Sequence, residues 1–125
     1  MAVRGIRGAT TATANTAEEI IEATQELLTA LLAANEIPRE EIASAFWTTT
    51  PDLTAEWPAF AARQMGFADV PQMDAHEMNV PGQLPLAIRV LLHVNTEKAQ
   101  SAVRHVFLRG ATVLRPEYAY PGPGE

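Results

Sequence analysis

Three arginines stand in extended or apolar stretches of the sequence, where arginine is uncommon. Arg7 lies near the start of the chain, Arg89 lies in the apolar run 86–94, and Arg115 comes directly before a proline. A strand core seldom holds an arginine unless its charge has a partner there. A guanidinium matches a carboxylate with two parallel hydrogen bonds, which a lysine cannot form. We therefore predict that these arginines converge on an anionic small molecule.

Asp74 and Glu77 are the carboxylates that complete this set, in the extended stretch 70–78. Together with arginines they suit a ligand that carries several anionic groups and a hydroxyl, because a carboxylate accepts a hydrogen bond from a hydroxyl. A second interpretation stays open, in which each arginine forms a salt bridge with one of the 15 acidic residues. A metal site that includes His76 is disfavoured, since adjacent strand residues point to opposite faces.

The composition and the motifs narrow the classes of function. The chain has no cysteine, which excludes disulfides, thiolate catalysis and cysteine zinc sites and is typical of a cytoplasmic protein. The net charge of −6 argues against nucleic acid and against a membrane surface as partners. The sequence has neither a membrane-span pattern nor a signal-peptide pattern. It also lacks a phosphate-binding glycine loop, a serine elbow and histidines at metal-ligand spacing, so we predict no cofactor and no metal.

Strands and helices alternate loosely along the chain. We predict a long helix that begins after a capping box, Thr16 and Glu19, and ends near Asn35. The other expected elements are strands at 2–10, 42–50, 70–78, 86–94 and 106–108, a short helix at 58–65, a helical segment at 96–103 and an extended stretch at 111–115.

These elements predict an α+β (mixed α/β) fold, with a five-stranded mixed sheet that carries the long helix and the short helices on one face. Residues 1–117 should form one domain, followed by a mobile C-terminal tail at 118–125. One long helix cannot cover both faces of such a sheet, so we expect another subunit on the second face.

Several short motifs occur in order between residues 3 and 117. They are Arg4–Thr11, Thr50–Ala55, Pro58–Arg63, His76–Val80, Ile88–Val90, Arg104–Leu108 and Leu114–Pro116. Each motif alone is short, but the combination and spacing are specific. With them the sequence resembles the AroH class of monofunctional chorismate mutases over nearly the whole domain.

This resemblance implies an assembly and a reaction. The assembly is a homotrimer, a trimeric pseudo-α/β-barrel with active sites in clefts between subunits. The reaction is the unimolecular rearrangement of chorismate to prephenate in phenylalanine and tyrosine biosynthesis. It requires no covalent intermediate, metal or general acid or base. An enzyme accelerates it by holding the compact conformer and by stabilising charge on the breaking ether bond.

The resemblance also implies the roles of individual residues. Arg89 would donate to the ether oxygen and to a carboxylate, Arg7 would hold a carboxylate, and Glu77 would accept from the ring hydroxyl. The remaining implied substrate-binding residues are Trp57, Ala59, Phe60 and Arg63 from the neighbouring subunit, Met73 and Asp74 beside Glu77, Phe107, and Arg115 at the entrance.

Three positions depart from the family pattern. Phe107 stands where a tyrosine is common, Phe60 where some members have a lysine, and Asp74 where members often have a cysteine or serine. A second carboxylate at Asp74 would either repel a dianion or stay protonated and donate to the hydroxyl. Two alternatives therefore stay open: a chorismate- or prephenate-binding module with weak catalysis, and a mutase that acts on a modified chorismate.

Overall fold

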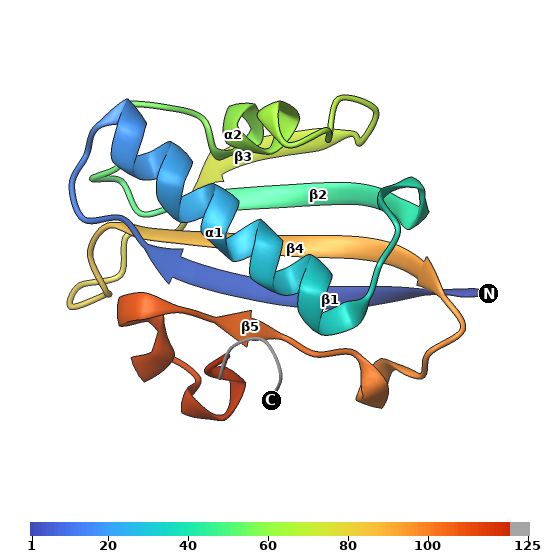
Figure 1. The fold of residues 1–125 in the computed structure, drawn as a ribbon. Helices are drawn as coiled ribbons and strands as arrows, with labels where there is room; N and C mark the ends of the chain where they lie inside the picture. The colour runs from blue at the N-terminus through green and yellow to red at the C-terminus, as the bar shows by residue number, and fades with distance from the viewer. Residues whose placement is uncertain (121–125) are drawn as a thin grey trace.

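A long helix lies across a five-stranded sheet in the computed structural model, which describes residues 1–120 (Figure 1). The strands are β1 (Ala2–Thr11), β2 (Ile42–Thr49), β3 (Gln72–His76), β4 (Ala87–Thr96) and β5 (Val106–Phe107). The α-helices are α1 (Ala17–Asn35) and α2 (Pro58–Gln64). Within the described residues there are also four 3₁₀ helices, which lie outside the strands and α-helices: η1 (Arg39–Glu41), η2 (Gln100–Ala102), η3 (Arg109–Val113) and η4 (Pro116–Tyr118).

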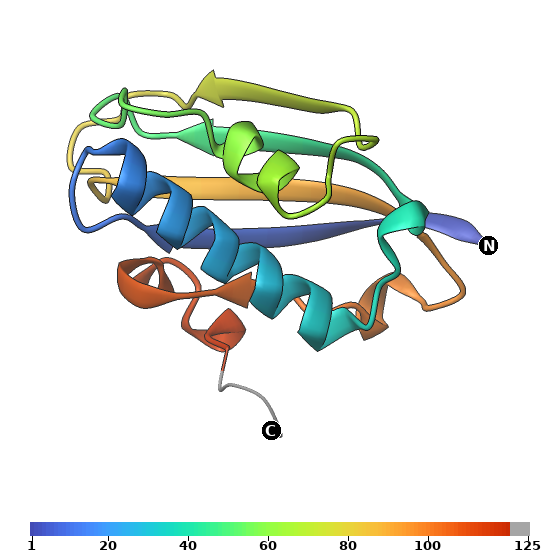
Figure 2. The same cartoon turned by 45° about the horizontal axis from the view of Figure 1, so that its top comes forward.

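The sheet is mixed, with the strand order β3-β2-β4-β1-β5. The central pairs β2–β4 and β4–β1 are antiparallel, whereas the outer pairs β3–β2 and β1–β5 are parallel. Both α-helices lie on the same face of this sheet (Figure 2). The predicted α+β fold, with five strands and the helices on one face, is confirmed.

The long helix α1 begins and ends where the sequence predicts. Thr16 Oγ1 accepts a hydrogen bond from the backbone N–H of Glu19 at 3.2 Å, which satisfies one free donor of the first turn. At the other end, Glu36 adopts a left-handed conformation with φ 52° and its N–H bonds to Leu32 O. The Asn35 side chain then ties this end to the chain before β5, because it donates to Arg104 O and accepts from Arg104 N.

Gly8 permits α1 to lie close to β1. A Cβ atom at Gly8 would lie 2.7 Å from Cδ1 of Leu31, 3.1 Å from Cγ1 of Val90 and 3.3 Å from Cδ1 of Leu27. These leucines are fully buried in the main core. Because a packed core accommodates added volume poorly, the glycine fixes the distance between helix and sheet.

We expect Gly8→Ala to lower the free energy of unfolding by about 1–3 kcal/mol, the usual effect of overpacking a core. Gly5→Ala is the matched control in the same strand, since its Cβ would meet only Leu91 Cδ1 at 3.6 Å. Urea denaturation followed by circular dichroism measures both. Equal losses for the two variants would show that the approach of α1 does not depend on Gly8.

The two faces of β4 separate the core from the second surface of the sheet. Its residues that point to the helices are fully or almost fully buried, namely Ile88, Val90, Leu92 and Val94, as the alternating pattern predicts. Within residues 1–120, no α-helix lies on the other face (Figure 2). There Leu91 pairs with Phe46, which pairs with Met73, and these last two side chains are 43% and 63% exposed.

Two predicted segments differ from the structure. The stretch 111–115, predicted as extended, lies mostly in the 3₁₀ helix η3, because Arg109 takes φ 51° and turns the chain back beside β1. The segment 96–103, predicted as helical, contains only the single turn η2, since the pairing of β4 with β1 continues to Thr96. Both errors concern turns that tertiary contacts determine.

The predicted mobile tail, 118–125, is partly packed. Tyr118 N donates to Arg115 O at 2.9 Å, and Tyr120 N donates to Phe107 O at 3.3 Å. Ala119 also forms an isolated bridge with Phe107. The packed segment therefore continues beyond residue 117, and the rest of the predicted tail, 121–125, lies outside the described residues.

Candidate active site

Strand register places Arg7 and Arg89 on the face of the sheet opposite the helices. Arg7 on β1 pairs with Leu91 on β4, and Arg89 on β4 pairs with Ala9 on β1. The two arginines are therefore diagonal neighbours across one strand pair, with side chains on the same face. Burial lowers the pKa of Arg7, and the charge of the neighbouring Arg89 lowers it further.

Glu77 reaches the same face from the end of β3. Its backbone N–H donates to Thr49 O at 2.9 Å, and its Oε2 accepts from Thr48 Oγ1 at 3.0 Å. Thr48 is the register partner of Arg89, and Arg89 Nε lies 3.3 Å from Glu77 Oε2. This ion pair is not aligned as a hydrogen bond, so within residues 1–120 the buried Arg89 Nε has no hydrogen-bond acceptor.

Arg7 is the centre of a concentration of positive charge. Burial lowers the pKa of its guanidinium, and the charges of Arg89 and Arg115 lower it further. Its Cζ lies 5.8 Å above the ring of Phe107. Like charges held this close favour a bound anion, because the anion relieves their mutual repulsion.

Arg115 belongs to this group through the tail. Its Nε lies 3.2 Å from Glu117 Oε1, and its Cζ lies 4.4 Å from the ring centroid of Tyr118. The side chain is exposed, as a residue at an entrance would be. The structure thus brings together four predicted polar site residues, Arg7, Glu77, Arg89 and Arg115, with Phe107 at their side.

Sequence reasoning missed His105, which supports Arg7 from β5's side. The backbone N–H of Arg7 donates to His105 Nδ1 at 2.9 Å, so this nitrogen carries no proton. Burial lowers the pKa of His105, and the charges of Arg7 and Arg115 lower it further. A single histidine without spacing to other ligands gave no sequence signal, because its role depends on the parallel pairing of β1 with β5.

A second group of predicted site residues lies around α2, away from Arg7, Arg89 and Arg115. Trp57 is 64% exposed, and Arg63 places its Cζ 5.7 Å from the ring of Phe60. Ala59 is only 5% exposed and leaves little surface with which to line a cleft. A single chain does not bring this group to Arg7 and Arg89.

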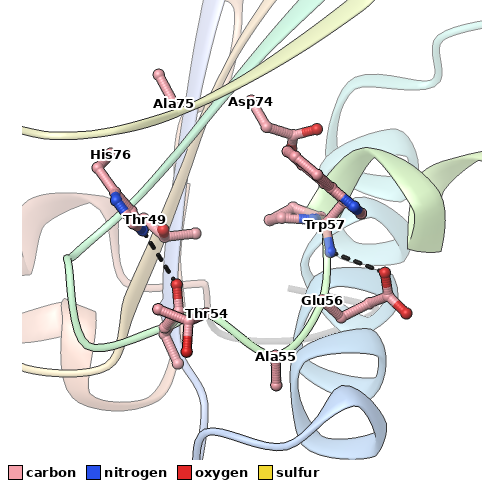
Figure 3. Close-up of a pocket in the computed structure, with 10 residues that line it drawn as sticks. Thr49, Thr54, Ala55, Glu56, Trp57, Asp74, Ala75 and His76 are labelled. Atoms are coloured by element: carbon pink, nitrogen blue, oxygen red, sulfur yellow. Dashed lines mark hydrogen bonds between the residues drawn. The ribbon is translucent and has the colours of Figure 1, made fainter.

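A hollow of about 390 Å³ lies between this second group and the end of β3 (Figure 3). Trp57, Asp74 and His76 line it with the loop from Leu53 to Glu56, and His76 Nε2 donates to Leu53 O at 3.1 Å. No arginine is among the described residues that line it. The hollow therefore lacks the charge for an anionic ligand and is not by itself the arginine site.

The face of the sheet that carries Arg7 and Arg89, here called the arginine face, suits the binding and electrostatic stabilisation of an anion. Three guanidinium groups and one carboxylate can hold a polyanion that also presents a hydroxyl. Among residues 1–120, no cluster of three or more histidine or acidic side chains has the geometry to hold a metal ion. No helix within the same residues is long and apolar enough to cross a membrane.

Comparison with known proteins identifies the family. The family model for chorismate mutase type I matches residues 3–118. The chain belongs to this family. It is 53% identical over 116 residues to the chorismate mutase AroH of Thermus thermophilus, and the matched region covers 92% of this chain and 95% of that relative. It is 42% identical over 118 residues to the chorismate mutase AroH of Bacillus subtilis, with coverages of 94% and 93%.

A solved structure also matches. The chorismate mutase from Clostridium thermocellum superposes with a TM-score of 0.86 and 46% identity, over 87% of this chain and 97% of that structure. The predicted family, and with it the prediction that the chain is an enzyme of the chorismate mutase class, is confirmed.

Asp74, one of the three departures from the chorismate mutase pattern, lies elsewhere in the chain's structure than predicted. Asp74 does not lie beside Glu77, because its register partner Trp47 points into the core below the helices. Asp74 Oδ1 instead accepts from the backbone N–H of Ala59 at 3.1 Å, on α2. Within one chain Asp74 therefore faces α2, and its predicted repulsion of a dianion stays a prediction for the assembled site.

We expect Asp74→Asn to raise the stability of this chorismate mutase family member as pH rises above about 4. Burial raises the pKa of Asp74, outweighing the opposing Ala59 hydrogen bond and Arg63 charge. The folded state therefore holds the proton more firmly than the unfolded state, and ionisation weakens the fold above the unfolded pKa. Asparagine keeps an acceptor for Ala59 without the charge.

Urea midpoints of wild type and Asp74→Asn at pH 4, pH 5.5 and pH 7 test this expectation, since the gap between them should widen with pH. Asp69→Asn, another aspartate, is the control because its side chain is exposed. A variant that is less stable than wild type at pH 7 would mean that the Asp74 charge stabilises the fold.

Proposed function

We propose that this protein is an isomerase that converts chorismate to prephenate for aromatic amino acid biosynthesis, without cofactor or covalent intermediate. The observation that carries the proposal is the arginine face, where the charges of Arg89 and Arg115 act on Arg7 and where Glu77 pairs with Arg89. Chorismate carries two carboxylates, a ring hydroxyl and an ether oxygen, and this set of side chains has a partner for each.

In this proposal Arg89 stabilises the transition state. Its Nε lies 3.3 Å from Glu77 Oε2, and this ion pair fixes where the partly exposed guanidinium is presented to a ligand. As the ether bond breaks, charge develops on its oxygen, and a preorganised donor there stabilises the transition state more than the substrate. The same guanidinium also holds a substrate carboxylate.

Arg7 and Glu77 hold the substrate in its compact conformer. Arg7 binds a carboxylate, and the neutral ring of His105 fixes the backbone from which it extends. Glu77 accepts from the ring hydroxyl and is itself oriented by Thr48. Holding two ends of one flexible molecule brings the reacting carbons together and lowers the entropic part of the barrier.

The proposed assembly is a homotrimer with active sites between subunits. Support comes from the sheet face without a helix, where Phe46 and Met73 expose apolar side chains in one row. A neighbour on this face would bury that row and supply Trp57, Phe60 and Arg63 to the cleft. We also propose that the enzyme acts in the cytoplasm, as part of amino acid biosynthesis.

An ultraviolet assay for the loss of chorismate tests the function directly. We expect purified protein to consume chorismate and to release an equal amount of prephenate, with a chelator present and no cofactor added. Light scattering on the same sample should give three times the chain mass of 13.6 kDa. Chorismate binding without turnover would replace the enzyme with a binding module.

A further inference from the structure

A tyrosine from the tail lies beside Phe107 on the arginine face. The rings of Tyr118 and Phe107 have centroids 5.6 Å apart and planes tilted by 53°. Tyr118 also contacts the ring of His105, with centroids 4.7 Å apart. Phe107 in turn lies under the Arg7 guanidinium. These contacts hold the Tyr118 phenol next to the ring of Phe107, which has no hydroxyl.

Tyr118 is also the partner that orients Arg115. Arg115 Nη2 donates to the Tyr118 hydroxyl oxygen at 2.9 Å, and the guanidinium lies over the same ring. A hydrogen bond and a cation–π contact to one side chain restrict a long arginine more than its exposed ion pair with Glu117 does. The tyrosine therefore determines where the Arg115 charge is presented.

The hydroxyl of Tyr118 keeps its proton available for a ligand. A phenol can accept one hydrogen bond while it donates another. The Arg115 bond uses the oxygen as acceptor, and within residues 1–120 no acceptor is present for the proton. A cation bonded to the oxygen makes the O–H a stronger donor. Arg7 and Arg115 both favour an anion at this position.

We propose that Tyr118 is a substrate-binding residue of this enzyme, whose hydroxyl donates to a carboxylate of the bound dianion while it positions Arg115. The inference rests on the proposed function, since the dianion is chorismate. Tyr118 thereby supplies from η4 the hydroxyl that Phe107 lacks on β5. The hydroxyl holds the substrate and its transition state equally, because it bonds to a carboxylate that does not react.

Tyr118→Phe removes this hydroxyl and keeps the ring. We expect KM for chorismate to rise about tenfold, the usual effect of losing one hydrogen bond to a charged group. We expect kcat to stay within about twofold, since uniform binding affects KM alone. Tyr120→Phe is the matched control, because the Tyr120 side chain packs against the main core and should leave both constants unchanged.

A second variant tests whether a hydroxyl on the ring at residue 107 can replace the one lost from Tyr118. Adding Phe107→Tyr to Tyr118→Phe should lower the raised KM toward the wild-type value, although the hydrogen bond that positions Arg115 stays lost. An unchanged KM in Tyr118→Phe, a fall in kcat alone, or a raised KM that Phe107→Tyr does not lower would each overturn the inference. Inactive wild-type protein would instead refute the proposed function, and the inference with it.

Discussion

Arg89→Ala is expected to lower kcat for chorismate by about 10²–10³-fold, while the chain keeps its fold. The reason is the position of the Arg89 guanidinium, which is partly exposed on the arginine face and held there by its ion pair with Glu77. Removal of one such donor from a developing negative charge costs about 3–4 kcal/mol in comparable sites. It also leaves Glu77 without its cation beside a dianionic substrate.

Two further variants make the Arg89 result specific. Arg89→Lys keeps the charge but loses the planar fork, so we expect most of the loss to remain. Arg39→Ala removes an exposed arginine of η1, whose guanidinium lies near Gly66 after α2, and should leave kcat unchanged. Steady-state kinetics and circular dichroism measure activity and folding. Near-normal kcat in Arg89→Ala would rule out transition-state stabilisation by this residue.

Trp47→Ala is expected to lower the free energy of unfolding by about 3–5 kcal/mol, a large part of the stability of a small domain. Trp47 is 1% exposed and lies on β2 in the core below the helices. Its Nε1 also donates to Gln72 Oε1 at 2.8 Å, which ties β2 to β3. Truncation removes both the apolar burial and this hydrogen bond.

Val113→Ala is the control for this prediction, because the Val113 side chain is 68% exposed and its truncation should change stability by no more than about 0.5 kcal/mol. Urea denaturation at one protein concentration compares the two variants, since dissociation of an oligomer contributes to the measured stability. Similar losses in the two variants would mean that the burial of Trp47 does not set the cost of its truncation.

The elements of this fold could be predicted because their patterns are local. Ile88 to Val94 alternate with period two, and Thr16 and Glu19 mark the start of α1 within four residues. Alternation along each strand predicts the face on which Arg7 and Arg89 lie, whereas their closeness depends on the register of β1 with β4. Family motifs then supplied the reaction, which no local pattern contains.

The parts that could not be predicted depend on contacts between distant segments. The face to which Asp74 points is set by the parallel register of β3 with β2, and the sequence of β3 has no clear alternation. Tyr118 lies in a stretch with few apolar residues that reads as a tail, and its position follows from the contact of the tail with Phe107. The role of His105 likewise depends on its hydrogen bond with the backbone of Arg7, which is distant in the sequence.

The position of β1 in the sheet has a consequence for how the protein is made. Of the five strands, β1 leaves the ribosome first and carries Arg7, but its two neighbours are β4, at 87–96, and β5, at 106–107. Its backbone groups therefore wait without these sheet partners until β4 and β5 have been made, and pairing over such long separations is slow. Binding activity should appear only after the chain has emerged past Phe107, when β1 is enclosed on both sides.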